Sequence, residues 1–139
     1  MLRQVLIIDD HDSDLLFSSL MVEHAKVAAT VTTFEDATEA LRYLQQPAGQ
    51  SVDLIFLDIN MPRMNGMEFL AAFEKLRLGA ASPAVVVMLT SSPDPRDREH
   101  AMAFASVRDY VIKPVDAEQV KQVVNRVFGP VHRAPDGHG

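Results

Sequence analysis

The segment Asp53-Leu54-Ile55-Phe56-Leu57-Asp58-Ile59-Asn60-Met61-Pro62 decides the fold. Residues 54–57 are all apolar and lack the alternation of a half-exposed strand, so they predict a strand that is buried on both faces. The run ends at Asp58, and Pro62 followed by Asn65-Gly66 predicts a loop, because proline cannot continue a strand ladder. A carboxylate at the C-terminal end of a buried parallel strand lies where open α/β sheets bind their ligands. Taken alone, Asp58 fits a solvated loop residue or a helix cap equally well.

The composition is that of an ordinary globular domain. The 139 residues are 47% hydrophobic and 23% charged, which is enough for one domain with a buried core. We expect this domain to span residues 1–129 and the Pro/Gly/His-rich segment 130–139 to be a disordered tail. No apolar run approaches the roughly 18 residues of a membrane span, and cysteine is absent, so we expect a cytoplasmic protein without a membrane partner. The net charge of −6 argues against a nucleic-acid partner.

Strand and helix patterns alternate five times along the chain. Short apolar or β-branched runs predict strands at 5–8, 30–34, 54–57, 84–89 and 110–112. Apolar residues at helical spacing predict a helix after each strand, and four of these helices are preceded by possible caps: Asp12, Asp36, Asp94 and Asp116. Because parallel neighbours need crossover helices, this alternation predicts an α/β fold with a five-stranded parallel, doubly wound sheet.

Polar residues close four of the predicted strands. Asp9 and Asp10 follow the first strand, Asp58 the third, Thr90 the fourth and Lys113 the fifth. Parallel strands of a doubly wound sheet end at one edge, so these side chains should converge in one crevice. Three carboxylates in one pocket repel one another unless a hard cation neutralises them, and Mg²⁺ suits oxygen ligands. Asp58 could then attack phosphorus as a carboxylate nucleophile, with Lys113 stabilising the charge of the transferred group.

The combination of motifs is more specific than any one of them. An acidic pair follows the first strand, and L-D-I-N-M-P-x-M-N-G (57–66), L-T-S (89–91) and Y-x-x-K-P (110–114) come later in the chain. In this order they resemble the receiver domain of two-component response regulators, of the stand-alone CheY-like type, over roughly residues 5–128. The resemblance implies a flavodoxin-like (β/α)5 fold with strand order 2-1-3-4-5.

The resemblance also implies a role for each site residue. It makes Asp58 the phosphoacceptor, assisted by Thr90 and Lys113. It implies that Mg²⁺ or Mn²⁺ is bound by Asp9, Asp10, Asp58 and the backbone carbonyl of Asn60, with Asp9 acting through water. Thr90 and Tyr110 would form a switch pair, although Tyr110 also fits a plain core residue, and Lys113-Pro114 would be a cis peptide.

The implied function is a phosphorylation-dependent switch. A histidine kinase or phosphotransfer protein would donate the phosphoryl group, and output would come through an unknown downstream protein, since no effector domain follows residue 129. The protein would catalyse only its own phosphorylation and dephosphorylation, so we do not expect a conventional enzyme. A homodimer through the fourth helix, fifth strand and fifth helix is a further expectation.

Three other functions compete with this one. The first is a phosphate-independent interaction module on the same fold, which the intact set of site positions disfavours. The second is a flavin-binding flavodoxin, which would need a Ser/Thr/Gly-rich phosphate loop where this chain has Asp9-Asp10-His11-Asp12. The third is a metal-dependent phosphatase with an aspartyl nucleophile, which typically carries a second aspartate two residues later as general acid. The chain has Asn60 there, and an amide cannot do this work.

Histidines and phenylalanines complete the candidate residues. His11 follows the acidic pair; it either borders the pocket or is a simple exposed loop residue, which is the interpretation we favour from sequence. His24, His100, His132 and His138 show no metal-site pattern. The sequence predicts that four phenylalanines belong to the core: Phe17, Phe56, Phe69 and Phe73.

Overall fold

A parallel sheet with helices on both faces forms the described part of the chain in the computed structural model, which describes residues 1–61, 64–78, 84–91 and 94–129. The sheet has five strands in the order β2-β1-β3-β4-β5, and all neighbouring strands pair in parallel. The predicted doubly wound, flavodoxin-like fold and its strand order are therefore confirmed. Pro62 and the predicted tail at 130–139 lie outside the described residues.

The strands mostly begin earlier than their apolar runs. They are β1 (Leu2–Ile8), β2 (Ala28–Phe34), β3 (Val52–Asp58), β4 (Val85–Thr90) and β5 (Val107–Ile112). The helices are α1 (Asp12–Ala25), α2 (Ala37–Leu44), α3 (Gly66–Leu78), α4 (Pro95–Met102) and α5 (Ala117–Phe128), with a short 3-10 helix η1 (Pro47–Ser51). Polar residues such as Arg3 and Asp53 extend the strands because pairing uses the backbone. Within the described ranges, no helix is both long and apolar enough to cross a membrane.

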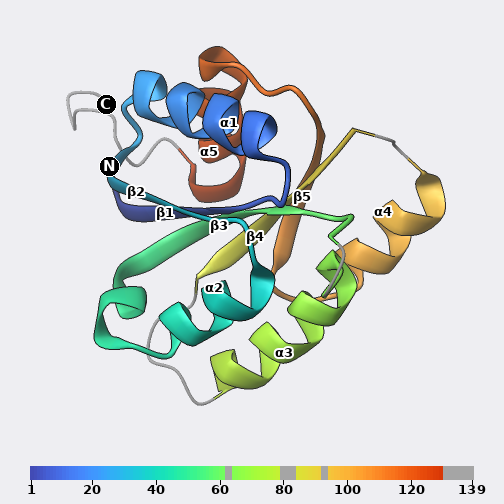
Figure 1. The fold of residues 1–139 in the computed structure, drawn as a ribbon. Coiled ribbons are helices and arrows are strands. Elements are labelled where there is room, and N and C mark those ends of the chain that lie inside the picture. Colours follow the sequence, from blue (N-terminus) through green and yellow to red (C-terminus); the bar gives the residue numbers. More distant parts are fainter. Residues whose placement is uncertain (62–63, 79–83, 92–93, 130–139) are drawn as a thin grey trace.

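Helices cover both faces of the sheet. Helices α1 and α5 lie on one face and α2, α3 and α4 on the other (Figure 1). Successive residues of β3 point alternately to the two layers: Ile55 packs with the α2–α4 side, and Phe56 packs with the α1 and α5 side. This double coverage explains why residues 54–57 are uniformly apolar.

Three of the four predicted helix caps are present. The side chains of Asp36 and Asp94 each accept a hydrogen bond from a backbone N–H two residues on, and Asp116 forms a reciprocal capping box with Gln119. The prediction for Asp12 is wrong, because Asp12 is the first residue of α1 and His11 is the N-cap. The N–H of His11 instead donates to Asp9 Oδ1 at 3.0 Å, so the chain turns into α1 around the acidic pair.

The outer face of α1 carries apolar side chains. Phe17 is 40% exposed, so its assignment to the core is wrong, whereas Phe56, Phe69 and Phe73 are buried as predicted. Helix α1 buries a different stripe, made of Leu15, Ser18, Val22 and Ala25. Leu16, Phe17 and Leu20 lie off this stripe and are exposed, because neighbouring residues of a helix do not share a face.

Candidate functional site

The predicted site residues gather at the C-terminal edge of the sheet. Asp9 follows β1, Asp58 ends β3, Thr90 ends β4, and Lys113 follows β5. The register of the parallel strands brings these residues to the same level of the sheet. Asp58 lies opposite Leu89, and the N–H of Lys113 donates to the carbonyl of Thr90 at 2.7 Å. The edge therefore unites residues that are about a hundred positions apart in the sequence, such as Asp9 and Lys113, whose separation is 104.

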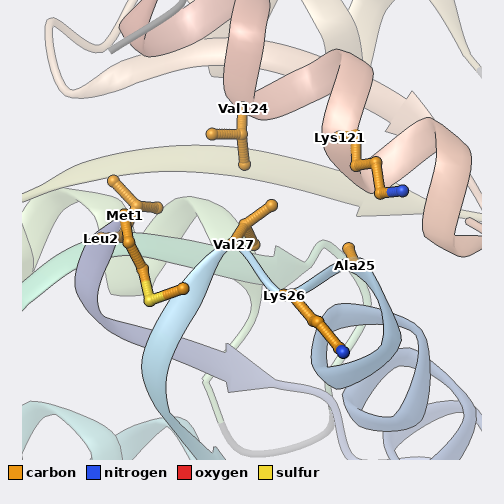
Figure 2. Close-up of a pocket in the computed structure, with 7 residues that line it drawn as sticks. All are labelled: Met1, Leu2, Ala25, Lys26, Val27, Lys121 and Val124. Carbon is orange, nitrogen blue, oxygen red and sulfur yellow. The ribbon is translucent and has the colours of Figure 1, made fainter. Parts of the chain in front are cut away.

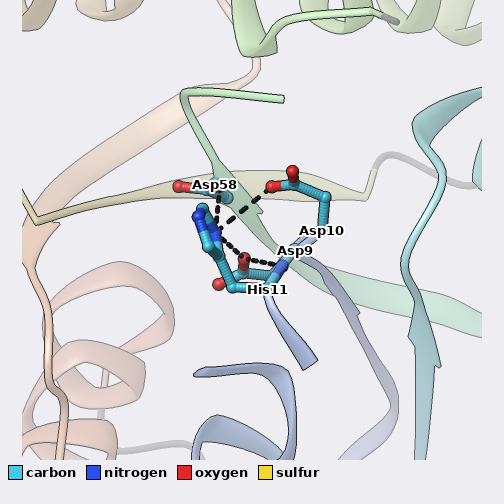
Figure 3. A group of neighbouring side chains, drawn as sticks. All are labelled: Asp9, Asp10, His11 and Asp58. Carbon is cyan, nitrogen blue, oxygen red and sulfur yellow. Dashed lines mark hydrogen bonds and ion pairs between the residues drawn. The ribbon is translucent and has the colours of Figure 1, made fainter. Parts of the chain in front are cut away.

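Four side chains form a compact cluster at this edge. Asp9, Asp10, His11 and Asp58 point toward one another (Figure 3), and one ligand atom from each lies within 4.8 Å of the others. Asp9 is fully buried, and the side chain of Asp58 is only 4% exposed. Three carboxylates this close, largely withdrawn from water, repel one another and need a compensating positive charge.

Lys113 provides part of that charge. Its Nζ donates to Asp9 Oδ2 at 2.9 Å and to Asp14 Oδ2 at 3.0 Å, and it lies 3.5 Å from Asp58 Oδ1. Burial lowers the pKa of Lys113, but the hydrogen bonds to Asp9 and Asp14 and the charge of Asp58 outweigh burial and raise the pKa above its usual value. Lys113 is therefore a permanent cation whose nearest partner is Asp9.

Asp14 is a site residue that sequence reasoning missed. It lies in the first turn of α1 and accepts a hydrogen bond from Lys113. The available signal was an acidic residue in the first turn of a helix that starts at the same edge as Asp9 and Asp10. Whether such a side chain reaches Lys113 depends on the rotation of α1 about its axis, which the sequence pattern does not specify.

Asp58 is held in surroundings that disfavour its charged form. Burial and the negative charge of Asp9 raise the pKa of Asp58 to about 6, although Lys113 pulls it down. Asp58 Oδ2 and Asp10 Oδ1 are buried and have no hydrogen-bond partner among the residues that the structure describes. Unpaired buried carboxylate oxygens are costly, so they indicate where a cation would bind. Two such oxygens beside a third carboxylate fit the oxygen ligands that Mg²⁺ prefers.

His11 is both exposed and part of the cluster. Its side chain is 58% exposed, yet its Nδ1 lies 3.2 Å from Asp9 Oδ1, 3.3 Å from Asp10 Oδ1 and 3.8 Å from Asp58 Oδ2. The hydrogen bond to Asp9 and the charge of Asp10 raise the pKa of His11 above its usual value. The two interpretations that the sequence left open therefore both describe this residue.

The remaining predicted residues lie on β4, on β5 and in the segments that follow β3 and β5. Thr90 is fully buried at the end of β4, and Asn60 follows β3 with an exposed side chain. Tyr110 on β5 is half-buried, and its Oη is buried with no hydrogen-bond partner in the described ranges. The Lys113–Pro114 peptide bond is cis. Gly66 opens α3 against the strand end, where an added Cβ would lie 3.0 Å from Ile59 Cα.

Two hollows of similar size lie at opposite edges of the sheet. One, of about 270 Å³, borders the cluster and is lined in part by Asp14, Lys113 and Pro114. The other, also about 270 Å³, lies where β1 and β2 begin, between the end of α1 and α5 (Figure 2). Its lining combines apolar side chains with Lys26 and Lys121, and none of the described residues that line it carries a carboxylate. Of these two hollows, the first is lined by Asp14 and Lys113, which belong to the charged edge described above.

Comparison with known proteins agrees with this geometry. The chain is 25% identical over 126 residues to hybrid signal transduction histidine kinase L of Dictyostelium discoideum, which covers 91% of this chain and 7% of the kinase. It is 26% identical over 127 residues to two-component response regulator ORR1 of Oryza sativa subsp. japonica, covering 88% of this chain and 54% of that protein. The chain thus spans about half or less of these curated relatives.

Solved structures give the same result. A crystal structure of a two-component response regulator from Cytophaga hutchinsonii superposes with a TM-score of 0.82 at 29% identity, covering 91% of this chain and 97% of that chain. A family model described as the response regulator receiver domain matches residues 5–125. This chain therefore belongs to the response regulator receiver domain family.

Proposed function

We propose that this domain is the phosphoacceptor of a two-component or phosphorelay system and that Asp58 takes the phosphoryl group. The observation that carries the proposal is Asp58 Oδ2, a buried carboxylate oxygen without a hydrogen-bond partner among the described residues, close to Asp10 and Lys113. A carboxylate kept out of water and short of partners is more reactive as a nucleophile than a solvated one.

The chemistry is a transfer between two nucleophiles. A carboxylate oxygen of Asp58 forms a bond to phosphorus while the bond from phosphorus to the donor nitrogen of a phosphohistidine breaks, and that nitrogen keeps the electron pair. Lys113 Nζ, 3.5 Å from Asp58 Oδ1, balances charge on the transferred group. The domain would act only on its own aspartate, so we do not propose a conventional enzyme.

A divalent cation, Mg²⁺ or Mn²⁺, would complete the site. Asp10 Oδ1, Asp58 Oδ2 and the backbone carbonyl of Asn60 would hold it. Both oxygens of Asp9 already accept hydrogen bonds, from the N–H of His11 and from Lys113, which supports an indirect role for Asp9 through water. When bound, the ion would stabilise negative charge on the phosphoryl oxygens.

Thr90 and Tyr110 would carry the signal away from Asp58. The phosphoryl group adds acceptor oxygens near the end of β4, to which the hydroxyl of Thr90 can donate. This hydrogen bond would draw the backbone at Thr90 toward Asp58, and the ring of Tyr110 would turn into the space that is vacated. The Tyr110 hydroxyl is buried without a partner in the described part of the chain, so its present position gains nothing from hydrogen bonding.

Fluorine NMR of fluorotyrosine-labelled protein tests this coupling, because the chain has two tyrosines. Tyr43 is the internal control. Its hydroxyl accepts a hydrogen bond from Gln4 on β1 at 2.6 Å, and β3 and β4 separate β1 from β5 in the sheet. Phosphorylation should shift the Tyr110 signal and leave that of Tyr43 in place, and Thr90→Ala should abolish the shift. An equal Tyr110 shift in phosphorylated Thr90→Ala would disprove the coupling.

Partners follow from the same chemistry. We propose a histidine kinase or a histidine phosphotransfer protein as donor and a protein as target, with the domain acting as a stand-alone regulator. Met102 and Ile112 are exposed apolar residues on α4 and β5, which supports a homodimer through α4, β5 and α5. Sedimentation velocity before and after phosphorylation would reveal such a dimer.

The decisive experiment is phosphorylation in vitro. Purified protein is incubated with Mg²⁺ and acetyl phosphate, and intact mass is followed for one added phosphoryl group. The test variant is Asp58→Asn, and the matched control is Asp53→Asn, because Asp53 lies on the same strand at the opposite edge. We expect one Mg²⁺-dependent adduct in the wild type and in Asp53→Asn and none in Asp58→Asn. An adduct in Asp58→Asn would disprove the assignment.

A further inference from the structure

We infer that His11 is a ligand of the bound cation through Nδ1, so that the site favours transition ions such as Co²⁺ and Zn²⁺ over Mg²⁺ more strongly than an all-oxygen site would. The inference rests on the proposed function, because it concerns the cation that neutralises Asp10 and Asp58. It adds a nitrogen donor to a set that otherwise contains only oxygen atoms.

The spacing of the atoms carries the inference. Nδ1 of His11 is 3.2 Å from Asp9 Oδ1, 3.3 Å from Asp10 Oδ1 and 3.8 Å from Asp58 Oδ2 (Figure 3). Ligands at about 2.1 Å from one ion are about 3.0 Å apart along an octahedral edge and about 3.4 Å apart along a tetrahedral edge. The distance from His11 Nδ1 to Asp10 Oδ1 falls within this range, and that to Asp58 Oδ2 exceeds it by a few tenths of an ångström. The contact with Asp9 Oδ1 is a hydrogen bond, since Asp9 is not a direct ligand in this proposal.

Two carboxylate oxygens near the ring of His11 support the same assignment. The two oxygens of Asp9 are already engaged by the N–H of His11 and by Lys113. Asp10 Oδ1 and Asp58 Oδ2 are buried and accept no hydrogen bond from the residues that the structure describes, and both are near the ring nitrogen of His11. The side chain of Asp58 is 4% exposed, so water cannot readily replace the missing partner.

The backbone holds His11 in this position. It is the N-cap of α1, its N–H donates to Asp9 Oδ1 at 3.0 Å, and its carbonyl accepts from the N–H of Leu15 at 2.9 Å. The ring itself is 58% exposed, so removing it leaves the hydrophobic core intact. His24 and His100 lie on α1 and α4 and do not belong to the cluster.

A nitrogen ligand would make the site prefer some metal ions over others. Imidazole nitrogen is a good ligand for Zn²⁺ and other first-row transition ions, whereas Mg²⁺ prefers oxygen and keeps several of its own water molecules. His11 should therefore strengthen the binding of Co²⁺ and Zn²⁺ and contribute little to the binding of Mg²⁺.

The test is metal binding by the untagged, EDTA-treated full chain. Isothermal titration calorimetry measures the affinity for Zn²⁺ and for Co²⁺, competition against Co²⁺ measures the affinity for Mg²⁺, and the visible spectrum of bound Co²⁺ reports a nitrogen ligand directly. The test variant is His11→Ala. His24→Ala is the matched control, and a His132→Ala, His138→Ala double variant measures binding by the histidines near the C-terminus.

We expect His11→Ala to lose roughly tenfold or more in affinity for Co²⁺ and Zn²⁺ and to change the Co²⁺ spectrum, with Mg²⁺ binding nearly unchanged. The control variants should behave as the wild type. Wild-type Co²⁺ affinity and spectrum in His11→Ala would overturn the inference. Tighter binding of every ion by His11→Ala would overturn it too, because the imidazole would then be a competitor of the ion.

Failure of this inference differs from failure of the proposed function. If the wild type is phosphorylated in Mg²⁺ and His11→Ala binds metals as the wild type does, only the assignment of His11 is wrong. If the wild type gives no adduct with acetyl phosphate while His11→Ala still loses Co²⁺ affinity, the phosphoacceptor proposal fails and the metal ligand stands.

Discussion

Strand β3 carries an aspartate near each end, and the two carboxylates lie in opposite surroundings. Asp53 accepts hydrogen bonds from the backbone N–H and from Nη2 of Arg3, each at 2.7 Å. Burial raises the pKa of Asp53, but these bonds and the charge of Arg3 outweigh burial and lower the pKa below its usual value. Asp58 has like-charged neighbours and an unpaired buried oxygen, and its pKa is raised to about 6.

The difference teaches how one strand serves two purposes. At the N-terminal edge, Arg3 on the neighbouring strand β1 satisfies Asp53, so that carboxylate contributes to folding. At the C-terminal edge, Lys113 is shared among Asp9, Asp14 and Asp58, and the acidic charge exceeds the basic charge. An uncompensated buried carboxylate costs stability, and a bound cation would relieve that cost.

The largest expected effect comes from removing the shared lysine. Lys113→Met keeps an apolar stem but removes the charge beside Asp58, so phosphorylation by acetyl phosphate should slow about 100-fold, a typical loss for a group that stabilises transition-state charge. A time course of intact mass measures the rate, and circular dichroism confirms folding.

Arg3→Met is the matched control for Lys113→Met, since it removes a cation from the other edge of the sheet. It should be phosphorylated at the wild-type rate. Equal rates for Lys113→Met and wild type would contradict the role of Lys113 and weaken the contrast between the two edges.

A smaller effect is expected on stability from Asp58→Asn in metal-free buffer. The pKa of Asp58 in the folded state is about 6, above the value of about 3.9 expected for an unfolded chain. The folded state therefore binds the proton more tightly, and stability falls as pH rises from about 4 to 6. At pH 7.5 the variant should be more stable than the wild type by about 1–2 kcal/mol, allowing for solvent screening.

Urea denaturation at two pH values tests this expectation. The advantage of Asp58→Asn should be present at pH 7.5 and almost absent near pH 3, where wild-type Asp58 is mostly protonated in both the folded and the unfolded state. A gain of the same size at both pH values would indicate a packing effect and would contradict the electrostatic explanation.

The smallest effect, of opposite sign, is expected from Asp53→Asn. The pKa of Asp53 is lower in the folded state than in the unfolded chain, so its contribution is present above about pH 4 and is lost as pH falls through the folded-state pKa. The variant should therefore show a slightly lower urea midpoint at pH 7. This deficit should shrink in high salt, because the side chain of Arg3 is 60% exposed.

A deficit for Asp53→Asn that persists unchanged at pH 2 would contradict the ion-pair explanation. If instead Asp58→Asn raises stability and Asp53→Asn lowers it at pH 7.5, the two carboxylates of β3 lie in opposite electrostatic surroundings.

Much of the site could be predicted because it depends on where strands end. Asp9, Asp58, Thr90 and Lys113 each follow or close an apolar run, and parallel strands must end at a common edge. The burial of Phe17 was predicted wrongly, and the pairing of Asp14 with Lys113 was not foreseen. Both depend on the rotation of α1 about its axis, which the packing of its other face decides.

The sequence by itself determined the alternation of strands and helices, the burial of β3 and the edge at which the polar residues collect, because hydrophobic pattern and chain direction act over a few neighbouring residues. Only the tertiary structure decided which oxygen of Asp58 lacks a partner, which carboxylates share Lys113, and that the ring of His11 reaches the acidic cluster. These properties depend on separations of about 3–4 Å between atoms, and electrostatic and hydrogen-bond energies change steeply over such distances.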